Sequence, residues 1–158
     1  MTMLELPIDS VLVPVDFSDA AWAAVANAAA LVKDTTRLHI VHVLPPNLVG
    51  PDAPFLDVAD QGDLLGNARQ MLVERLTESG LAGAHVHVSF APGNPAATIA
   101  DTALALGVDL VLIPSHGRTG LLRLALGSVA ERVVRLAPCP VLVIKGGTPP
   151  QTQLEKNR

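Results

Sequence analysis

Five short runs rich in branched apolar residues alternate along the chain with longer stretches of helical character. The runs cover residues 11–15, 38–43, 85–90, 109–114 and 140–145. The longer stretches cover residues 18–33, 61–79, 95–106 and 128–136. Strands that alternate with helices are typical of βαβ units. The sequence therefore predicts an α/β fold with an open five-stranded parallel sheet and helices on both faces.

The character of each run predicts its place in the sheet. Runs 11–15 and 109–114 are apolar throughout, as central strands covered on both faces must be. Run 85–90 alternates valines with polar residues, which predicts an edge strand with one wetter face. The last run, Pro140 to Lys145, is apolar, and a bare edge of this kind invites pairing with another chain. We expect its own copy to cover it in a two-fold homodimer, with a helix or the tail as the alternative cover.

Turn residues support the helix boundaries. Ser18 or Asp19 suits the N-cap of the first helix. Gly93-Asn94-Pro95 opens the third helix, because proline is accepted at the first helical position, and Gly107 ends it. Residues 45–60 carry four prolines and no periodicity, so we expect a long loop there.

Composition excludes several classes of protein. The 158 residues are the size of one domain, which we expect over residues 1–146 with a flexible C-terminal tail over 147–158. Hydrophobic residues make up 49% and charged residues 16%, so the chain is not disordered. The net charge of −4, without a basic run, lacks the electrostatic footprint of nucleic-acid binding.

Cysteine usage and apolar length bear on compartment. Cys139 is the single cysteine, so the chain has no internal disulfide and no cysteine-based zinc cluster. The stretch 20–32 is too short and too interrupted to cross a membrane. The first ten residues lack the basic and apolar segments of a secretory signal, and we expect a cytoplasmic protein.

The segment Pro114–Ser128 is the most informative for chemistry. It joins a predicted strand to a predicted helix through Gly117, Gly120 and Gly127. The first N–H groups of a helix have no internal partners and carry the positive end of the helix dipole. A glycine-lined loop that runs into such a helix is suited to phosphate.

A purely structural interpretation of the same segment stays open. Ser128 and Glu131 have the S-x-x-E spacing of a capping box, which satisfies two of these N–H groups internally. The P-loop pattern G-x-x-x-x-G-K-[ST] is absent from the chain, and no G-x-G-x-x-G follows the first strand.

The chain resembles the universal stress protein family (the UspA superfamily). The resemblance runs from VLVPVDFSDAA near the start to PCPVLVIK, and SHGRTGLLRLALGSVAERVVRLAPCPVLVIK is its most specific part. It implies a Rossmann-like five-stranded sheet in the order 3-2-1-4-5 and a homodimer paired through the last strands. It also implies ATP or AMP held between the ends of the first and fourth strands.

Nucleotide-binding members of the family carry G-x2-G-x9-G-[ST] after the fourth strand. Gly117 matches the second glycine, and Gly127 with Ser128 matches the close of the pattern after nine intervening residues. By the same resemblance Asp16 falls on the acidic residue that contacts ribose, and Val43 on the residue whose backbone meets adenine. The full set expected to bind the nucleotide is Pro14, Val15, Asp16, Val43, Ser115, His116, Gly117, Arg118, Gly127, Ser128, Val129 and Ala130.

One position departs from the family pattern. Pro114 stands where the first glycine is expected, and proline has no N–H and fixes φ near −65°. A contact that depends on that N–H or on positive φ is therefore lost. The alternative is that Pro114 merely ends a central strand while the other residues hold the phosphates.

Two candidate site residues have alternative structural roles. Asp16 suits either a ligand contact at the end of a strand or an N-cap of the first helix. Ser18 and Asp19 are closer to that helix start, which favours the ligand role. His116 suits either a phosphate contact or packing under the loop, because no oriented partner for acid–base catalysis is apparent.

We expect a dimeric module that binds ATP or AMP, either alone or together with Mg²⁺. We expect no dedicated catalytic activity. No catalytic residue or protein metal site is predicted. A slow nucleotide hydrolase is one alternative, although phosphoryl transfer needs a positioned base or metal ligand that the sequence does not show. A dimeric protein-interaction module without nucleotide is the other, and Pro114 favours it.

Overall fold

The computed structural model describes residues 8–44, 58–117 and 126–145, with only the backbone of residues 58–62. All strand pairings are parallel, and the sheet order is β3-β2-β1-β4-β5, as predicted. The strands are β1 (Val11–Pro14), β2 (Leu38–Leu44), β3 (His87–Pro92), β4 (Leu110–Pro114) and β5 (Val141–Ile144). The helices are α1 (Asp19–Leu31), α2 (Val58–Glu78), α3 (Pro95–Leu106) and α4 (Ser128–Leu136), with a 3₁₀ turn η1 (Thr35–Arg37).

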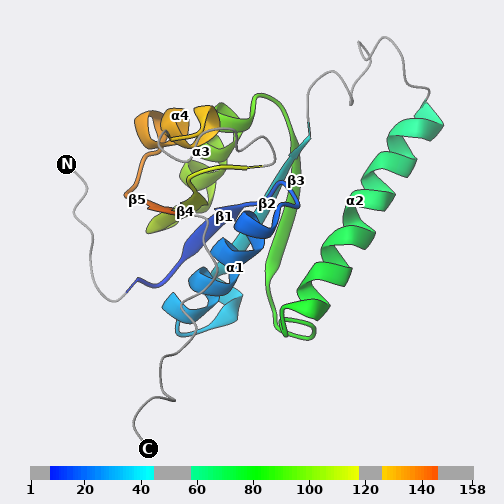
Figure 1. Cartoon of the computed structure of the whole chain (residues 1–158), viewed down its shortest axis with the longest axis horizontal. Coiled ribbons are helices and arrows are strands. Elements are labelled where there is room, and N and C mark those ends of the chain that lie inside the picture. The colour runs from blue at the N-terminus through cyan, green and yellow to red at the C-terminus, as the bar shows by residue number, and fades with distance from the viewer. Residues whose placement is uncertain (1–7, 45–57, 118–125, 146–158) are drawn as a thin grey trace, which may run out of the picture.

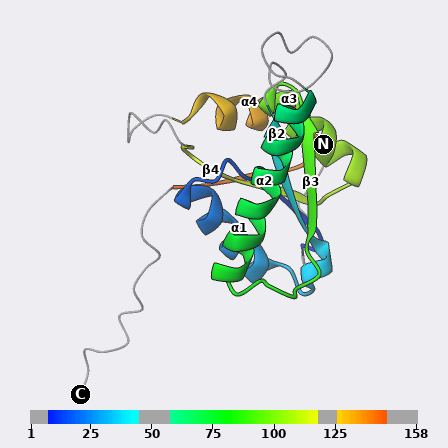
Figure 2. The same cartoon turned by 90° about the vertical axis from the view of Figure 1, so that its right-hand side faces the viewer.

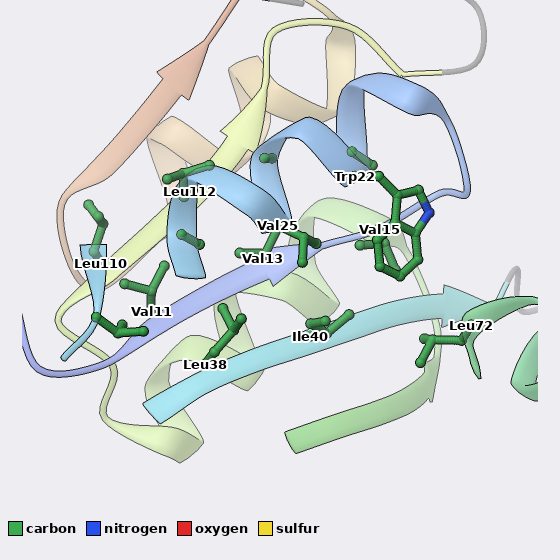
Figure 3. Close-up of a cluster of buried hydrophobic side chains, with 14 residues drawn as sticks. Val11, Val13, Val15, Trp22, Val25, Leu38, Ile40, Leu72, Leu110 and Leu112 are labelled. Carbon is green, nitrogen blue, oxygen red and sulfur yellow. The ribbon is translucent and has the colours of Figure 1, made fainter. Parts of the chain in front are cut away.

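Helices cover both faces of the sheet (Figure 1). On one face α1 packs against β1 and β2 in a cluster that includes Val13, Val25 and Ile40, all fully buried (Figure 3). On the other face α3 and α4 lie side by side over Leu12 and Val111. Because alternate β1 residues enter opposite clusters, this strand is buried on both sides, as its apolar sequence predicts.

Helix α2 lies beside the edge strand β3 (Figure 2). Its Leu72 enters the first cluster, and its Arg75 binds Asp19 of α1 at 2.6 Å. The Arg75 guanidinium also lies over the Trp22 ring, 5.7 Å from its centroid. None of the helices in the described ranges combines the length and apolar character that a membrane crossing requires.

The predicted boundaries are accurate where turn chemistry is clear. Helix α3 begins after Asn94, whose side chain accepts the Ala97 N–H, and ends at Gly107 in the left-handed conformation. The strand predicted at 85–90 instead begins at His87 and ends at Pro92, so both predicted ends were two residues early. The predicted loop 45–60 was too long, because α2 begins at Val58, beyond the last proline of that segment. Residues 45–57 and the tail 146–158 lie outside the described residues.

Candidate functional site

A pocket of about 280 Å³ opens at the carboxyl ends of β1, β2 and β4. Strand order reverses between β1 and β4, and open parallel sheets bind ligands at such a switch point. The first turns of α3 and α4 complete the pocket. Its lining consists of Pro14, Val15, Asp16, Val41, His42, Val43, Pro95, Ile99, Ile113, Pro114, Ser115, Gly117, Gly127, Ser128, Val129 and Ala130.

The turn from β1 into α1 fixes Asp16. Asp16 Oδ1 accepts hydrogen bonds from the Ser18 N–H at 3.1 Å and from the Ser18 hydroxyl at 2.5 Å. Ser18 is itself the N-cap, because its Oγ accepts the Ala21 N–H at 3.2 Å. Asp16 therefore orients the capping residue and does not cap α1, and the other predicted cap, Asp19, is the first helical residue.

The residue after Asp16 adopts an unusual backbone conformation. Phe17 has φ of 64°, the left-handed region that a non-glycine residue enters at a cost of about 1–2 kcal/mol. Its ring packs on the His42 ring of β2, with centroids 4.6 Å apart. This contact holds Phe17 in place while the chain turns sharply from β1 toward the helix.

His42 ties the same turn to β2. Its Nδ1 lies 2.8 Å from the Val15 carbonyl. A carbonyl oxygen only accepts, so Nδ1 carries the proton in this hydrogen bond. His42 thus fixes the backbone directly before Asp16 and acts as a positioning residue at the mouth of the pocket.

Two glycines make close contacts at the site. A Cβ on Gly117 would collide with the Asp16 carboxylate Oδ2. A Cβ on Gly127 would lie 2.9 Å from the Ser115 carbonyl oxygen, which already accepts the Gly127 N–H at 2.8 Å. Glycine at these positions therefore lets the loop after β4 approach both Asp16 and its own strand end.

The N-terminus of α4 borders the pocket without a side-chain cap. Gly127 is the N-cap, and among the described residues no side-chain cap hydrogen-bonds the first turn. The Ser128–Glu131 capping box is therefore not formed, because Ser128 is already the first helical residue and Glu131 pairs with Arg135 at 2.6 Å instead. The N–H groups of Ser128, Val129 and Ala130 have no intrahelical acceptor, and all three residues line the pocket.

The structure brings together most of the predicted binding residues. Ten of them line the pocket: Pro14, Val15, Asp16, Val43, Ser115, Gly117, Gly127, Ser128, Val129 and Ala130. His116 does not line it, and its Nδ1 lies 3.0 Å from the Ser115 hydroxyl. Arg118 lies outside the described residues.

Sequence reasoning missed six lining residues: Val41, His42, Pro95, Ile99, Ile113 and, as part of the wall, Pro114. Pro95 had a usable signal, since it opens a helix that follows a parallel strand. All such helices begin at the same edge of the sheet. The apolar character of Val41, Ile99 and Ile113 gave no comparable signal, because any core position shows it.

The chemistry of the pocket is that of binding. Among the described residues that line it, the walls are mainly apolar and the charged side chain is that of Asp16. Over residues 8–44, 63–117 and 126–145, no three His, Cys, Asp or Glu side chains come close enough to hold a metal ion. The arrangement offers N–H donors for an anion at α4, a carboxylate for hydroxyl groups at β1, and an apolar slot near β2 and α3.

Comparisons with known proteins agree with this fold. Residues 7–145 match the model of the universal stress protein family. The universal stress protein MJ0531 of Methanocaldococcus jannaschii is 30% identical, with 85% of this chain and 81% of that protein covered. The structure of protein MJ0577 from the same organism superposes with a TM-score of 0.75 at 27% identity, covering 91% of this chain and all of the other.

A third relative was determined with a small ligand. The structure of a universal stress protein in complex with cAMP has a TM-score of 0.62 and 25% identity to this chain. The match covers 87% of this chain and 97% of the other.

Proposed function

Because the chain belongs to the universal stress protein family, we propose that its pocket binds an adenine nucleotide, ATP or AMP. The observation that carries this proposal is the convergence of three different groups on one pocket. They are the N–H groups that begin α4, the Asp16 carboxylate, and an apolar slot between β2 and α3. A nucleotide presents the matching set: phosphate, sugar hydroxyls and a flat base.

The phosphate is assigned to the start of α4. Ser128, Val129 and Ala130 supply N–H donors there, and the helix dipole adds a positive potential. Gly127 lets the backbone approach closely because it has no side chain. Ser115 lines the pocket before this helix, and Arg118 follows in the sequence of the same loop, so both remain part of the proposed phosphate side.

The sugar and base are assigned to the strand ends. Asp16 accepts from the ribose hydroxyls with its carboxylate, which Ser18 holds in place. The base lies between β2, at Val41 and Val43, and the first two turns of α3, at Pro95 and Ile99. The pocket volume of about 280 Å³ lies just below the usual range of ligand sites (~300–1,000 Å³), which favours a single small ligand. The relative solved with cAMP supports an adenine ligand.

We assign no dedicated catalysis to this site. Phosphoryl transfer requires a residue that positions or activates the nucleophile. It also requires protein groups that hold metal ions on the phosphates. Asp16 is the carboxylate of the pocket, and Ser18 already occupies one of its oxygens. The module is proposed to act in the cytoplasm during stress as a homodimer joined through its β5 strands, with bound nucleotide as the signal.

Calorimetric titration of nucleotide-stripped protein with ATP and with AMP, each with and without Mg²⁺, tests the proposal. We expect saturable binding of one nucleotide per chain, with a Kd near micromolar, or about −8 kcal/mol. No heat up to about millimolar ligand, weaker than roughly −4 kcal/mol, contradicts the proposal.

The second candidate function is a protein-interaction module that holds no nucleotide. Pro114 favours it, because this residue removes a backbone donor from the pocket wall. The same titration separates the two functions, since the interaction module gives no heat with any adenine nucleotide.

A further inference from the structure

The hydrogen-bond ladder between β1 and β4 stops early. These two strands are paired only at Val11 with Leu110 and at Leu12 with Val111. Their outer neighbours remain paired further along, since β1 pairs with β2 up to Pro14 and β4 pairs with β5 up to Pro114. The centre of the sheet is therefore unpaired before its strands end, at the edge where the pocket lies.

The direction of each backbone group follows from the two-residue repeat of a strand. The Val15 N–H donates to Val41 of β2, so odd residues of β1 face β2 and Pro14 faces β4. The N–H groups of Val111 and Ser115 donate to β5, so Pro114 faces β1. Pro14 and Pro114 thus face the same unpaired space from opposite sides, and we call this space the proline gap.

Continuing the observed register shows what each proline removes. The next two ladder bonds would run from the N–H of residue 14 to the Leu112 carbonyl and from the N–H of residue 114 to the Pro14 carbonyl. Proline has no N–H, so neither bond can form. The Leu112 and Pro14 carbonyls therefore lack the donors that the ladder would supply. Leu112 is fully buried and does not line the pocket, so the acceptor that the proline gap offers to a ligand is the Pro14 carbonyl.

We propose that the proline gap is a donor-free subsite that receives hydroxyl groups of the ligand's sugar, and that Pro114 makes it reject phosphate oxygens. A buried carbonyl without a donor costs free energy, and a hydroxyl supplies the missing donor. A phosphate oxygen would meet other acceptors there and no donor from either strand. Pro14 and Pro114 both line the pocket, so the proline gap is open to a ligand.

The assignment to the sugar rests on the proposed function. The base lies over β2 and the phosphate at α4, and the proline gap lies between these two places. The sugar is the part of a nucleotide that joins base to phosphate. Pro114 is thus a specificity-determining residue: by excluding phosphate from the proline gap, it sets the orientation of the nucleotide, with the base toward β2 and the phosphate toward α4.

Titration with AMP, 2′-deoxy-AMP and 3′-deoxy-AMP tests the subsite. In the unchanged protein we expect at least one deoxy analogue to bind roughly tenfold more weakly than AMP, because a carbonyl then lacks its donor. Pro114→Ala restores an N–H that donates to Pro14, so the penalty falls to about threefold or less. Pro92→Ala is the matched control, because Pro92 ends the edge strand β3 away from the pocket, and it keeps the full penalty.

The outcomes separate this subsite from the proposed function. If AMP binds and the Kd values of both deoxy analogues lie within about twofold of its own, the subsite is overturned while nucleotide binding stands. A penalty that stays unchanged in Pro114→Ala also overturns the subsite and assigns the discrimination to Asp16. Failure of all three ligands to bind overturns the proposed function, and the subsite with it.

Discussion

Gly127 lies so close to the Ser115 carbonyl that a hydrogen atom is the only substituent its Cα accommodates there. The neighbour is backbone, which cannot rotate out of the way as a side chain can. The same position begins α4 and leaves the N–H groups of its first turn to the pocket. Gly127 therefore has two roles: it lets the loop pack against Ser115, and it leaves the first N–H groups of α4 available to the pocket.

We expect Gly127→Ala to lower the free energy of unfolding by about 1–3 kcal/mol through overpacking against Ser115. Gly66→Ala is the control, because Gly66 is helical and a methyl group added to it would meet nothing within 4 Å. Alanine at such a position stabilises a helix by about 0.5–1 kcal/mol. Urea unfolding of both variants measures the difference. Equal midpoints for Gly127→Ala and the parent protein would contradict the tight contact.

The site residues differ in how far sequence predicts them. Asp16, Gly117 and Gly127 are predicted, because they stand at strand and helix ends in a recognisable spacing. Phe17 and His42 are not, since a positive φ at phenylalanine has no sequence signal and the His42 bond to Val15 depends on cross-strand register. Contacts between neighbouring strands appear only once the sheet order is known.

Elements are predicted well where local chemistry determines them. Asn94 and Gly107 bound α3 through a side-chain cap and a left-handed turn, and the prediction for that helix is correct at both ends. The Ser128–Glu131 capping box fails because Gly127, one residue earlier, takes the N-cap position. Strand β3 extends two residues past its prediction because its pairing with β2 continues to Leu44 and Pro92.

The pairing of β2 with β3 brings two histidines together. His39 lies opposite His87, with ring centroids 5.0 Å apart and planes nearly parallel. Burial lowers the pKa of His39 below its usual value of 6.5, and the nearby His87 and Arg37 charges lower it further. The folded protein therefore binds a proton at His39 less readily than the unfolded chain does.

This shift predicts acid sensitivity of the sheet edge. The stabilising contribution is complete above about pH 6.5 and is lost as pH falls through the folded pKa, because the unfolded chain then binds more protons. We expect His39→Gln to flatten the fall in Tm between about pH 7 and pH 5. His85→Gln, at an exposed position before β3, should keep the slope of the parent protein. If Tm falls with pH as steeply in His39→Gln as in the parent protein, the assignment to His39 is wrong.

At the scale of the whole molecule, β5 is the strand at one edge of the sheet. The carbonyls of Pro140 and Ile144 accept from β4, so even residues face inward and the N–H of Val143 faces outward. Leu142 is 43% exposed on the same strand. A two-fold copy of the chain that pairs along this edge would satisfy the outward groups.

We expect Val143→Pro to abolish a dimer formed through β5, because it removes an outward N–H without breaking the ladder to β4. Val143→Ala keeps that N–H and should remain dimeric. Light scattering after size-exclusion chromatography, at several concentrations, distinguishes the two. A Val143→Pro protein that dimerises like its parent would place the interface elsewhere.

The location of bound nucleotide tests the central claim most directly. A crystal structure of the protein with AMP should show the phosphate at the N–H groups of Ser128–Ala130, the sugar at Asp16 and the proline gap, and adenine beside Val41 and Val43. Well-defined AMP bound at any other place, or an empty pocket at millimolar AMP, would contradict the account.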